Sequence, residues 1–196
     1  MKPLEAVFEG ETVIIPLSRG LVSIIDAKNW DLVKDKKFHA RYDKKAKKFY
    51  GQTCKKVRVE GKIHSYYTQL HRLIMGLTDP SIQCDHKNND GLDNREQNLR
   101  VASNSQNCAN CKKQEGRSSK YKGVYWRANR NHWVAQVVCD GKRYHLKCHK
   151  DEEAAARAYD KKALEVFGEF AKLNFPESKP ESTIVINDLT GEFTTN

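Results

Sequence analysis

The sequence lacks any long hydrophobic run, and no stretch approaches the ~20 consecutive apolar residues that a transmembrane helix needs. The first ten residues carry glutamates where a secretory signal peptide would have its apolar core. We therefore expect an intracellular protein that stays in the cytoplasm of the host cell and has no membrane partner. Apolar content is also low, at 38% of 196 residues, which disfavours one large buried core and favours two compact modules.

Acidic residues are the scarcer charged class, because 35 lysines and arginines face 25 aspartates and glutamates and the formal net charge is +10. Residues 1–117 carry +8, residues 118–175 carry +5, and the tail from Pro176 onward carries −3. Both basic parts fit a partner rich in phosphate groups. The six cysteines do not indicate a disulfide framework in an intracellular chain of this length.

Residues 12–74 have the pattern of a β-rich region. Apolar and β-branched runs bounded by turn residues predict strands at Thr12–Leu17, Leu21–Ile25, Lys37–Tyr42, Phe49–Thr53 and Lys56–Ile63. Apolar residues at helical spacing then predict a helix over Tyr66–Met75 that ends at Gly76. A short apolar run, an Asn/Asp/Gly loop, a strand over Leu99–Ala102 and a helix capped by Ser103 or Asn104 complete this part.

The C-terminal part begins after a polar linker. Three short strands are expected at Tyr121–Arg127, Trp133–Cys139 and Lys142–Cys148, and a helix that Asp151 caps follows and ends near Gly168. The fold class is therefore α+β, with a three-stranded antiparallel sheet packed on one helix in this part. We divide the chain into a first domain over 1–112 (core motif 70–112), a linker over 113–118, a second domain over 119–176 and a disordered tail over 177–196.

The segment from Cys84 to Asn107 holds the residue types that phosphodiester hydrolysis requires. A neutral His86 can deprotonate a water molecule, and a hard divalent cation can offset the negative charge of the transition state. Asp85 and Asn107 supply a carboxylate and an amide oxygen, a light ligand set of the kind that Mg²⁺ accepts. Neighbours in a strand point to opposite faces, so we expect the chain to bulge or turn at Asp85–His86.

Several spaced blocks of this part resemble the HNH endonuclease family, in particular the phage-type homing endonucleases. The matching blocks are Leu70–Ile74, Asp85–His86, Gly91–Arg95, Glu96–Arg100 and Ser105–Asn107. The resemblance implies a ββα-metal nuclease domain with a β-rich N-terminal extension, in which His86 is the general base and Asp85 and Asn107 hold Mg²⁺ or Mn²⁺. It further implies that Asn98 braces the loop between the two strands through backbone hydrogen bonds.

Two features of the motif region stay open. His71 lies on an apolar segment, where a packing histidine is the favoured interpretation over a catalytic one. Cys108 and Cys111 have the spacing of a zinc-ligand pair, but a closed structural site needs four ligands. Reduced cysteines that bind no metal are therefore favoured over a structural zinc.

Residues 118–176 resemble the ethylene-response-factor (Apetala-type) DNA-binding domain. The matching residues are Ser119–Val124, Trp133–Val137, Glu152–Asp160 and Ala171–Pro176. The resemblance implies that the sheet lies in the major groove of double-stranded DNA, which admits such a face. The positions that contact DNA in that family correspond to Lys122, Tyr125, Arg127, Gln136, Val138, Arg143 and His145. Lys122, Tyr125 and Val138 replace family arginines, so the target preference is expected to differ.

The combined prediction is a metal-dependent DNA endonuclease of homing type that its C-terminal domain positions on DNA. One metal site per chain predicts nicking by a monomer. A non-catalytic DNA-binding regulator with a decayed nuclease domain is the alternative, and RNA binding by the same basic sheet is a weaker third interpretation.

Overall fold

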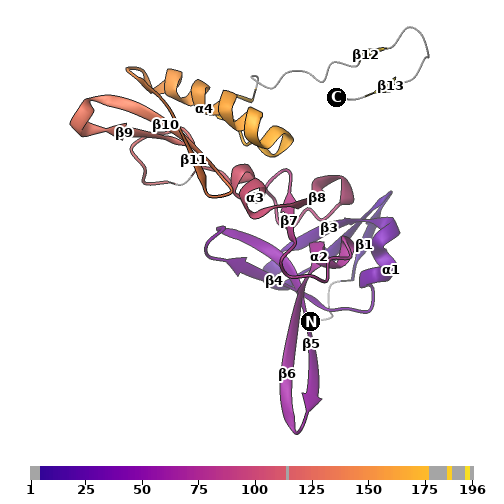
Figure 1. The fold of residues 1–196 in the computed structure, drawn as a ribbon. Coiled ribbons are helices and arrows are strands. Elements are labelled where there is room, and N and C mark those ends of the chain that lie inside the picture. Colours follow the sequence, from indigo (N-terminus) through magenta and orange to yellow (C-terminus); the bar gives the residue numbers. More distant parts are fainter. Residues whose placement is uncertain (1–4, 114, 177–184, 187–192, 195–196) are drawn as a thin grey trace. The chain divides into compact units, whose positions relative to one another are not determined.

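A computed structural model describes residues 5–113, 115–176, 185–186 and 193–194 of the chain. It divides into two compact units, Met1–Asn110 and Cys111–Asn196. Both units combine small antiparallel sheets with short helices, as the α+β prediction requires (Figure 1). Most of the expected disordered tail, residues 177–196, lies outside the described residues. The described parts of it, β12 (Val185–Ile186) and β13 (Phe193–Thr194), pair antiparallel.

The first unit contains two three-stranded antiparallel sheets and one two-stranded sheet. The first sheet has the order β1-β2-β3, the second has the order β4-β5-β6, and the third pairs β7 with β8. The strands are β1 (Val7–Glu9), β2 (Thr12–Pro16), β3 (Val22–Asp26), β4 (Phe38–Asp43), β5 (Lys48–Val59), β6 (Lys62–Gln69), β7 (Gln83–His86) and β8 (Leu99–Ala102). The helices are α1 (Trp30–Val33), α2 (Leu70–Ile74) and α3 (Asn104–Asn110).

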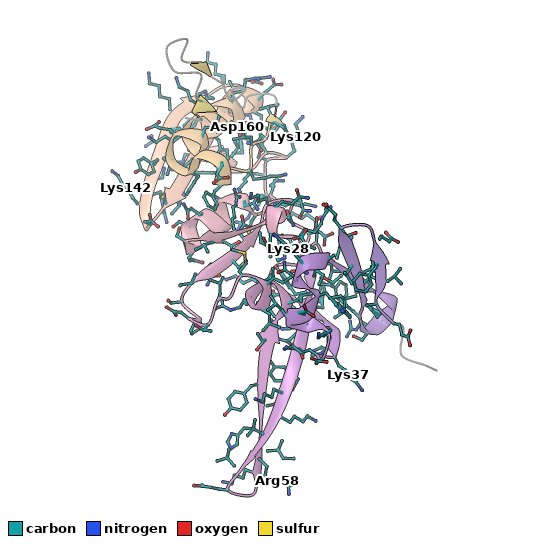
Figure 2. All side chains as sticks on the ribbon, turned by 90° about the vertical axis from the view of Figure 1, so that its right-hand side faces the viewer. Lys28, Lys37, Arg58, Lys120, Lys142 and Asp160 are labelled. Carbon is teal, nitrogen blue, oxygen red and sulfur yellow. The ribbon has the colours of Figure 1, made fainter. Side chains whose placement is uncertain are left out.

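The helix predicted over Tyr66–Met75 is wrong in its first half. Tyr66–Gln69 belong to β6, where Tyr66 pairs with Lys55 and Gln69 with Gln52 of β5, and the helix begins only at Leu70. Tyr and Thr favour strands, and pairing with a distant segment overrides the local helical spacing of the apolar residues. The result is a long β5–β6 hairpin that extends well beyond the rest of the unit, with Arg58 near its far end (Figures 1 and 2).

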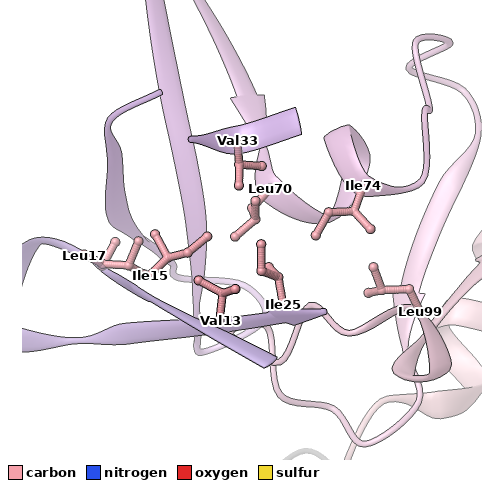
Figure 3. Close-up of a cluster of buried hydrophobic side chains, with 9 residues drawn as sticks. Val13, Ile15, Leu17, Ile25, Val33, Leu70, Ile74 and Leu99 are labelled. Carbon is pink, nitrogen blue, oxygen red and sulfur yellow. The ribbon is translucent and has the colours of Figure 1, made fainter. Parts of the chain in front are cut away.

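The core of the first unit joins the first two sheets to α1, α2 and β8. Its buried side chains are Val13, Ile15, Leu17, Ile25, Val33, Ala40, Leu70, Ile74 and Leu99 (Figure 3). Alternate residues of β2 and β3 point into this core, which is why Val13 and Ile25 are wholly buried. Leu99 ties β8 to the same core, so the segment with the HNH-like residues is anchored to a rigid framework.

The second unit confirms the prediction of a three-stranded antiparallel sheet packed on one helix. The sheet order is β11-β10-β9, formed by β9 (Val124–Arg127), β10 (His132–Cys139) and β11 (Lys142–His149), and α4 spans Glu152–Phe167. Asp151 caps α4 by accepting a 2.7 Å hydrogen bond from the Ala154 amide. Alanines at 155 and 163 are buried, which lets the helix backbone lie close to the sheet.

Gly123 shows how closely α4 and the sheet are packed. Its φ of +73° is in the left-handed region, and a Cβ at this position would overlap the ring of Tyr159 from α4. Only glycine satisfies both demands. The Asp160 carboxylate, on the next residue of α4, accepts hydrogen bonds from the backbone amides of Asn174 (2.8 Å) and Phe175 (2.8 Å) and so holds the segment after the helix.

Candidate functional site

The candidate site in the first unit is built from β7, β8 and α3, which follow one another along the chain, and from the loop that joins the two strands. β7 and β8 pair antiparallel, with Asp85 opposite Arg100 and His86 opposite Leu99. The register is regular through His86, so no bulge forms at Asp85–His86. A turn follows immediately instead, where Asn89 has a φ of +66° and its amide donates to the His86 carbonyl at 2.9 Å.

The loop between β7 and β8 is docked on the first two sheets. The Ile24 amide donates to the Leu92 carbonyl (2.9 Å), and the Asn94 amide donates to the Ile24 carbonyl (2.7 Å). At Gly91 a Cβ would overlap the carbonyl oxygen of Phe49 and crowd the ring of Tyr50, so the loop backbone lies directly on β5. These contacts hold a polar loop in one conformation.

His86 is buried, with 5% of its surface exposed. Burial lowers the pKa of His86 below its ordinary value, and this effect outweighs the hydrogen bond to Asn94 and the charge of Asp85, both of which raise it. The imidazole is therefore neutral near pH 7, which is the state that a general base requires.

A chain of hydrogen bonds determines which ring nitrogen of His86 carries the proton. The Ser23 hydroxyl donates to the Leu92 carbonyl (2.7 Å), so its oxygen accepts from Asn94 Nδ2 (2.7 Å). The Asn94 amide is thereby oriented with Oδ1 toward His86 Nε2, 3.2 Å away. A carbonyl oxygen can only accept, so Nε2 carries the proton and Nδ1 is left with a free lone pair.

Sequence reasoning did not identify Asn94 or Ser23 as part of the site. Asn94 is wholly buried and lies eight residues after His86, within a run that is also typical of ordinary turns. Ser23 comes from β3, far away in the sequence. The only indication in the sequence that Ser23 is buried was the alternation of the strand, which places it on the face that points to the core.

Asp85 is buried and hydrogen-bonded on both oxygens. Arg100 approaches Oδ2 through Nε and Nη2, each at 2.9 Å, and Asn110 Nδ2 lies 2.9 Å from Oδ1 and 3.0 Å from Oδ2. The same amide nitrogen also donates to the His86 carbonyl at 2.9 Å. Asn110 Nδ2 is therefore surrounded by oxygen atoms beside Asp85, whereas the residue predicted from the sequence was Asn107.

Asn107 is half-buried on the same helix, three residues earlier. Its Nδ2 lies 3.5 Å from Oε1 of Gln83, which shares a face of β7 with Asp85. Because positions three apart are neighbours on a helix, Asn107 and Asn110 follow one another along the face of α3 that meets β7. The metal-ligand role predicted for Asn107 stays a prediction.

Asn98 links the two ends of the β7–β8 loop. Its Oδ1 accepts from the Asn88 amide (3.0 Å), and its Nδ2 donates to the Asp93 carbonyl (2.7 Å). The side chain thus contacts the loop backbone at two points, and its bracing role stays a prediction. It makes these contacts from a buried position next to β8.

His71 lies against His86. Their ring centroids are 4.9 Å apart in an edge-to-face arrangement, and Tyr50 packs on both rings at 5.8 and 5.9 Å. Burial, together with the neighbouring charges of His86 and Arg72, lowers the pKa of His71 to about 3. A packing role was the favoured interpretation of His71, and the structure adds that its packing partner is the candidate base.

For the cysteine pair, reduced residues that bind no metal stay the prediction. Cys108 and Cys111 are both exposed, and the described residues contain no group of three or more His, Cys, Asp or Glu side chains that could hold a metal ion. Burial raises the pKa of the Cys84 thiol, which precedes Asp85 on β7, to about 11.

The second unit gathers six of the seven predicted DNA-contacting residues on one face of its sheet. Cross-strand partners share a face, and here Gln136 pairs with His145 and Val138 with Arg143. Alternate residues of β10 on the other face, Ala135 and Val137, are buried against α4. The open face therefore presents Tyr125, Arg127, Gln136, Val138, Arg143 and His145.

Lys122, the seventh residue, precedes β9 and is held by other contacts. Its amide donates to Asn174 Oδ1 (2.7 Å), and its ammonium donates to the Cys111 carbonyl (2.7 Å). The segment predicted as a linker also contacts this unit, since Ser118 Oγ accepts from the Trp126 amide at 3.0 Å. Within the described part of the chain, no helix is long and apolar enough to cross a membrane.

Comparisons with known proteins match parts of the chain. Residues 119–169 match the AP2 domain family, which confirms the resemblance to the ethylene-response-factor domain. The chain is 38% identical over 111 residues to an uncharacterized HNH endonuclease of Acanthamoeba polyphaga mimivirus, covering 54% of this chain and 57% of that protein. It is 49% identical over 59 residues to an AP2/ERF and B3 domain-containing protein of Oryza sativa subsp. japonica, covering 30% of this chain and 16% of that protein. No solved structure matches the chain. The chain thus contains a segment that matches the AP2 domain family and is similar over 111 residues to a protein named an HNH endonuclease, and it spans little more than half the length of that viral relative.

Proposed function

We propose that this protein is a metal-dependent HNH-type DNA endonuclease that nicks double-stranded DNA as a monomer. The AP2 domain would place it on its target, and the homing-type role follows from the resemblance of its motif blocks to phage-type enzymes. The observation that carries the proposal is the environment of His86. A buried neutral imidazole, held by a directed hydrogen-bond chain, is arranged for proton transfer.

In this proposal His86 Nδ1 takes the proton of the attacking water. Asn94 holds the opposite nitrogen, so the ring keeps one tautomer and one orientation throughout. Asn98 braces the loop from Lys87 onward and keeps His86 at the end of β7. Tyr50 and His71 exclude solvent from the buried side of the ring.

Asp85 and α3 supply oxygen donors that fit a hard divalent cation, Mg²⁺ or Mn²⁺. Asp85 would contribute the carboxylate and Asn107 of α3 an amide oxygen. Asn110 presents its Nδ2 to Asp85, and its Oδ1 accepts from Asn89. The four oxygens within 3.4 Å of Asn110 Nδ2, from Asp85 and the carbonyls of His86 and Lys87, accept from that nitrogen, so a cation that used them as ligands would displace the Asn110 amide. When bound, the cation would polarise the scissile phosphate and stabilise the leaving 3′ oxygen.

The open face of the AP2 sheet supplies DNA affinity and position in this proposal. Arg127 and Arg143 are the residues on that face best suited to bidentate contacts with guanine in the major groove. Since one chain contains one candidate site, each binding event cuts one strand.

One observation favours the alternative of a DNA-binding regulator without catalytic activity. The guanidinium of Arg100 already pairs with Asp85 at 2.9 Å and neutralises the carboxylate that a cation would need. Purified protein incubated with supercoiled plasmid and Mg²⁺ or Mn²⁺ separates the two functions. Nicked circles that disappear with EDTA support the nuclease, whereas a mobility shift without nicks at every metal and salt concentration supports the regulator.

A further inference from the structure

The outer part of the β5–β6 hairpin, Lys55–Tyr67, forms a two-stranded ribbon with no described layer packed on it. All residues from Lys62 to Tyr67 of β6 are exposed, and both faces of the ribbon are open to solvent (Figure 2). Five cross-strand pairs, from Lys55–Tyr66 to Val59–Lys62, extend it by roughly 16 Å at the usual rise of about 3.3 Å per residue. Isolated two-stranded ribbons are marginally stable in water, so the exposed length of this ribbon indicates a role other than folding.

The composition of the ribbon indicates a binding surface. Large apolar side chains are strongly exposed at Val59 (46%), Ile63 (60%), Tyr66 (57%) and Tyr67 (61%). Exposed apolar residues gathered on one element mark interaction sites in soluble proteins. Four cations accompany them, at Lys55, Lys56, Arg58 and Lys62, against one acid at Glu60. Within the described residues, none of these cations forms a salt bridge.

The charge of the ribbon indicates which class of macromolecule it binds. Residues 55–67 carry a formal charge of +3, and both basic parts of the chain are positive, so a second copy would be repelled. Lysine is also depleted in protein–protein interfaces, whereas it is a usual contact to nucleic-acid phosphates. The major groove of duplex DNA, about 12 Å wide, admits a two-stranded ribbon between its phosphate walls.

The ribbon is continuous with the candidate site. β5 begins at Lys48, whose ammonium donates to Asn89 Oδ1 at 2.8 Å, and its Tyr50 packs on His86. β6 leads directly into α2, which contains His71. A groove that held the ribbon would therefore fix the phosphate backbone relative to His86 through two strands of one sheet.

We propose that the ribbon Lys55–Tyr67 inserts into a groove of duplex DNA and anchors the first unit there, independently of the AP2 domain. The inference rests on the proposed function for the identity of the substrate, but it concerns binding and not cleavage. The ribbon sets the offset between the DNA that it grips and the phosphate presented to His86.

The test compares two full-length variants that each lose three positive charges from the first unit. The ribbon variant is Lys55→Gln/Lys56→Gln/Arg58→Gln, and the control is Lys34→Gln/Lys36→Gln/Lys37→Gln, at positions that follow α1. Binding to a fluorescent 40-base-pair random-sequence duplex is measured by anisotropy in EDTA over a range of salt concentrations. The slope of log K against log salt is expected to fall by about two to three for the ribbon variant and by less than one for the control.

A second measurement identifies the partner directly. A photo-crosslinking amino acid at position 66 is expected to yield a protein–DNA adduct with the same duplex. Equal salt slopes for the two variants, or crosslinks to another copy of the chain in place of DNA, would overturn the proposal. Matching thermal unfolding curves show that both variants are folded. EDTA prevents cleavage, so the binding test is independent of catalysis. DNA binding that depends on the ribbon, in a protein that never nicks DNA, would refute the proposed nuclease activity alone. Nicking by a protein whose ribbon does not contribute to DNA binding would refute the ribbon proposal alone.

Discussion

Replacement of Asn94 by alanine tests how the structure orients His86. Asn94 is wholly buried and donates to Ser23 while accepting from His86 Nε2 at 3.2 Å. The Asn94→Ala variant leaves the buried Nε2–H without its partner, and such a loss costs about 1–3 kcal/mol. At about 1.36 kcal/mol per factor of ten, the nicking rate should fall by about 5- to 150-fold if this energy is lost from the transition state.

Two further variants separate orientation from simple damage to the fold. Ser23→Ala removes the contact on the far side of Asn94 but keeps the bond to His86, so its rate should fall less than that of Asn94→Ala. Asn94→Asp places a carboxylate next to the ring, which favours the imidazolium and raises the pKa of His86. The acid limb of the pH–rate profile should therefore move to higher pH in that variant, because the base is protonated at a higher pH.

The assay combines plasmid nicking with ¹⁵N NMR of the histidine rings. In the wild type we expect His86 to show a protonated Nε2 and an unprotonated Nδ1 at pH 7.5. A wild-type ring protonated at Nδ1 would refute the hydrogen-bond argument. So would an Asn94→Ala variant that nicks within twofold of the wild-type rate.

Three other predictions follow from single contacts. Asn107→Ala, which removes the amide oxygen proposed as a ligand, should weaken Mn²⁺ binding measured by calorimetry more than Asn110→Ala, whose Nδ2 donates to Asp85; an equal or larger effect of Asn110→Ala would contradict the proposed ligand set. Gly123→Ala should destabilise the second unit by about 3 kcal/mol or more in urea unfolding, since it adds an overlap with Tyr159 to a left-handed backbone. Gly141→Ala has a similar φ of +77° with nothing within 4 Å, so it should cost less, and equal losses would disprove the overlap. Because the pKa of His71 falls from 6.5 to about 3 on folding, the unfolded chain binds a proton there that the folded chain does not, and stability is lost as pH falls below 6.5. Between pH 7 and pH 5 the free energy of unfolding of His71→Phe should therefore fall by about 2 kcal/mol less than that of the wild type. An equal pH dependence of the two proteins would contradict this account.

The sequence predicted the second unit well because its structure is specified locally. Asp140–Gly141 is a two-residue hairpin turn, and Asp151 is a helix cap whose hydrogen bond the structure shows at 2.7 Å. The predicted strands and helix need only small adjustments at their ends. Here short-range chemistry and the global fold agree.

The first unit was harder to predict because its elements depend on distant pairing. Tyr67, Leu70, Leu73 and Ile74 are spaced as in a helix, yet Tyr67 pairs with Cys54 in a strand and only the later residues are helical. The short elements β1 and α1 were not predicted, since three or four residues carry too little periodicity.

The site shows the same limit at the level of single side chains. Asp85, His86, Asn98 and Asn107 were predicted from their order in the chain. The first three are buried and Asn107 is half-buried, and their roles stay predictions. Asn94 and Asn110 were missed, because an asparagine in a buried polar network has the same sequence context as one in an exposed turn. Only the structure shows which asparagine amide is buried and hydrogen-bonds to a histidine or a carboxylate in place of water.

The most direct test of the central claim measures strand scission by the wild type and by His86→Ala on the same supercoiled plasmid. Both proteins should bind the plasmid equally in EDTA, since His86 is buried and contributes no charge to DNA binding. With Mg²⁺ or Mn²⁺ added, the wild type should convert supercoiled DNA to nicked circles, and His86→Ala should leave it intact. Equal nicking by the two proteins, or none by the wild type under any metal condition, would contradict the account.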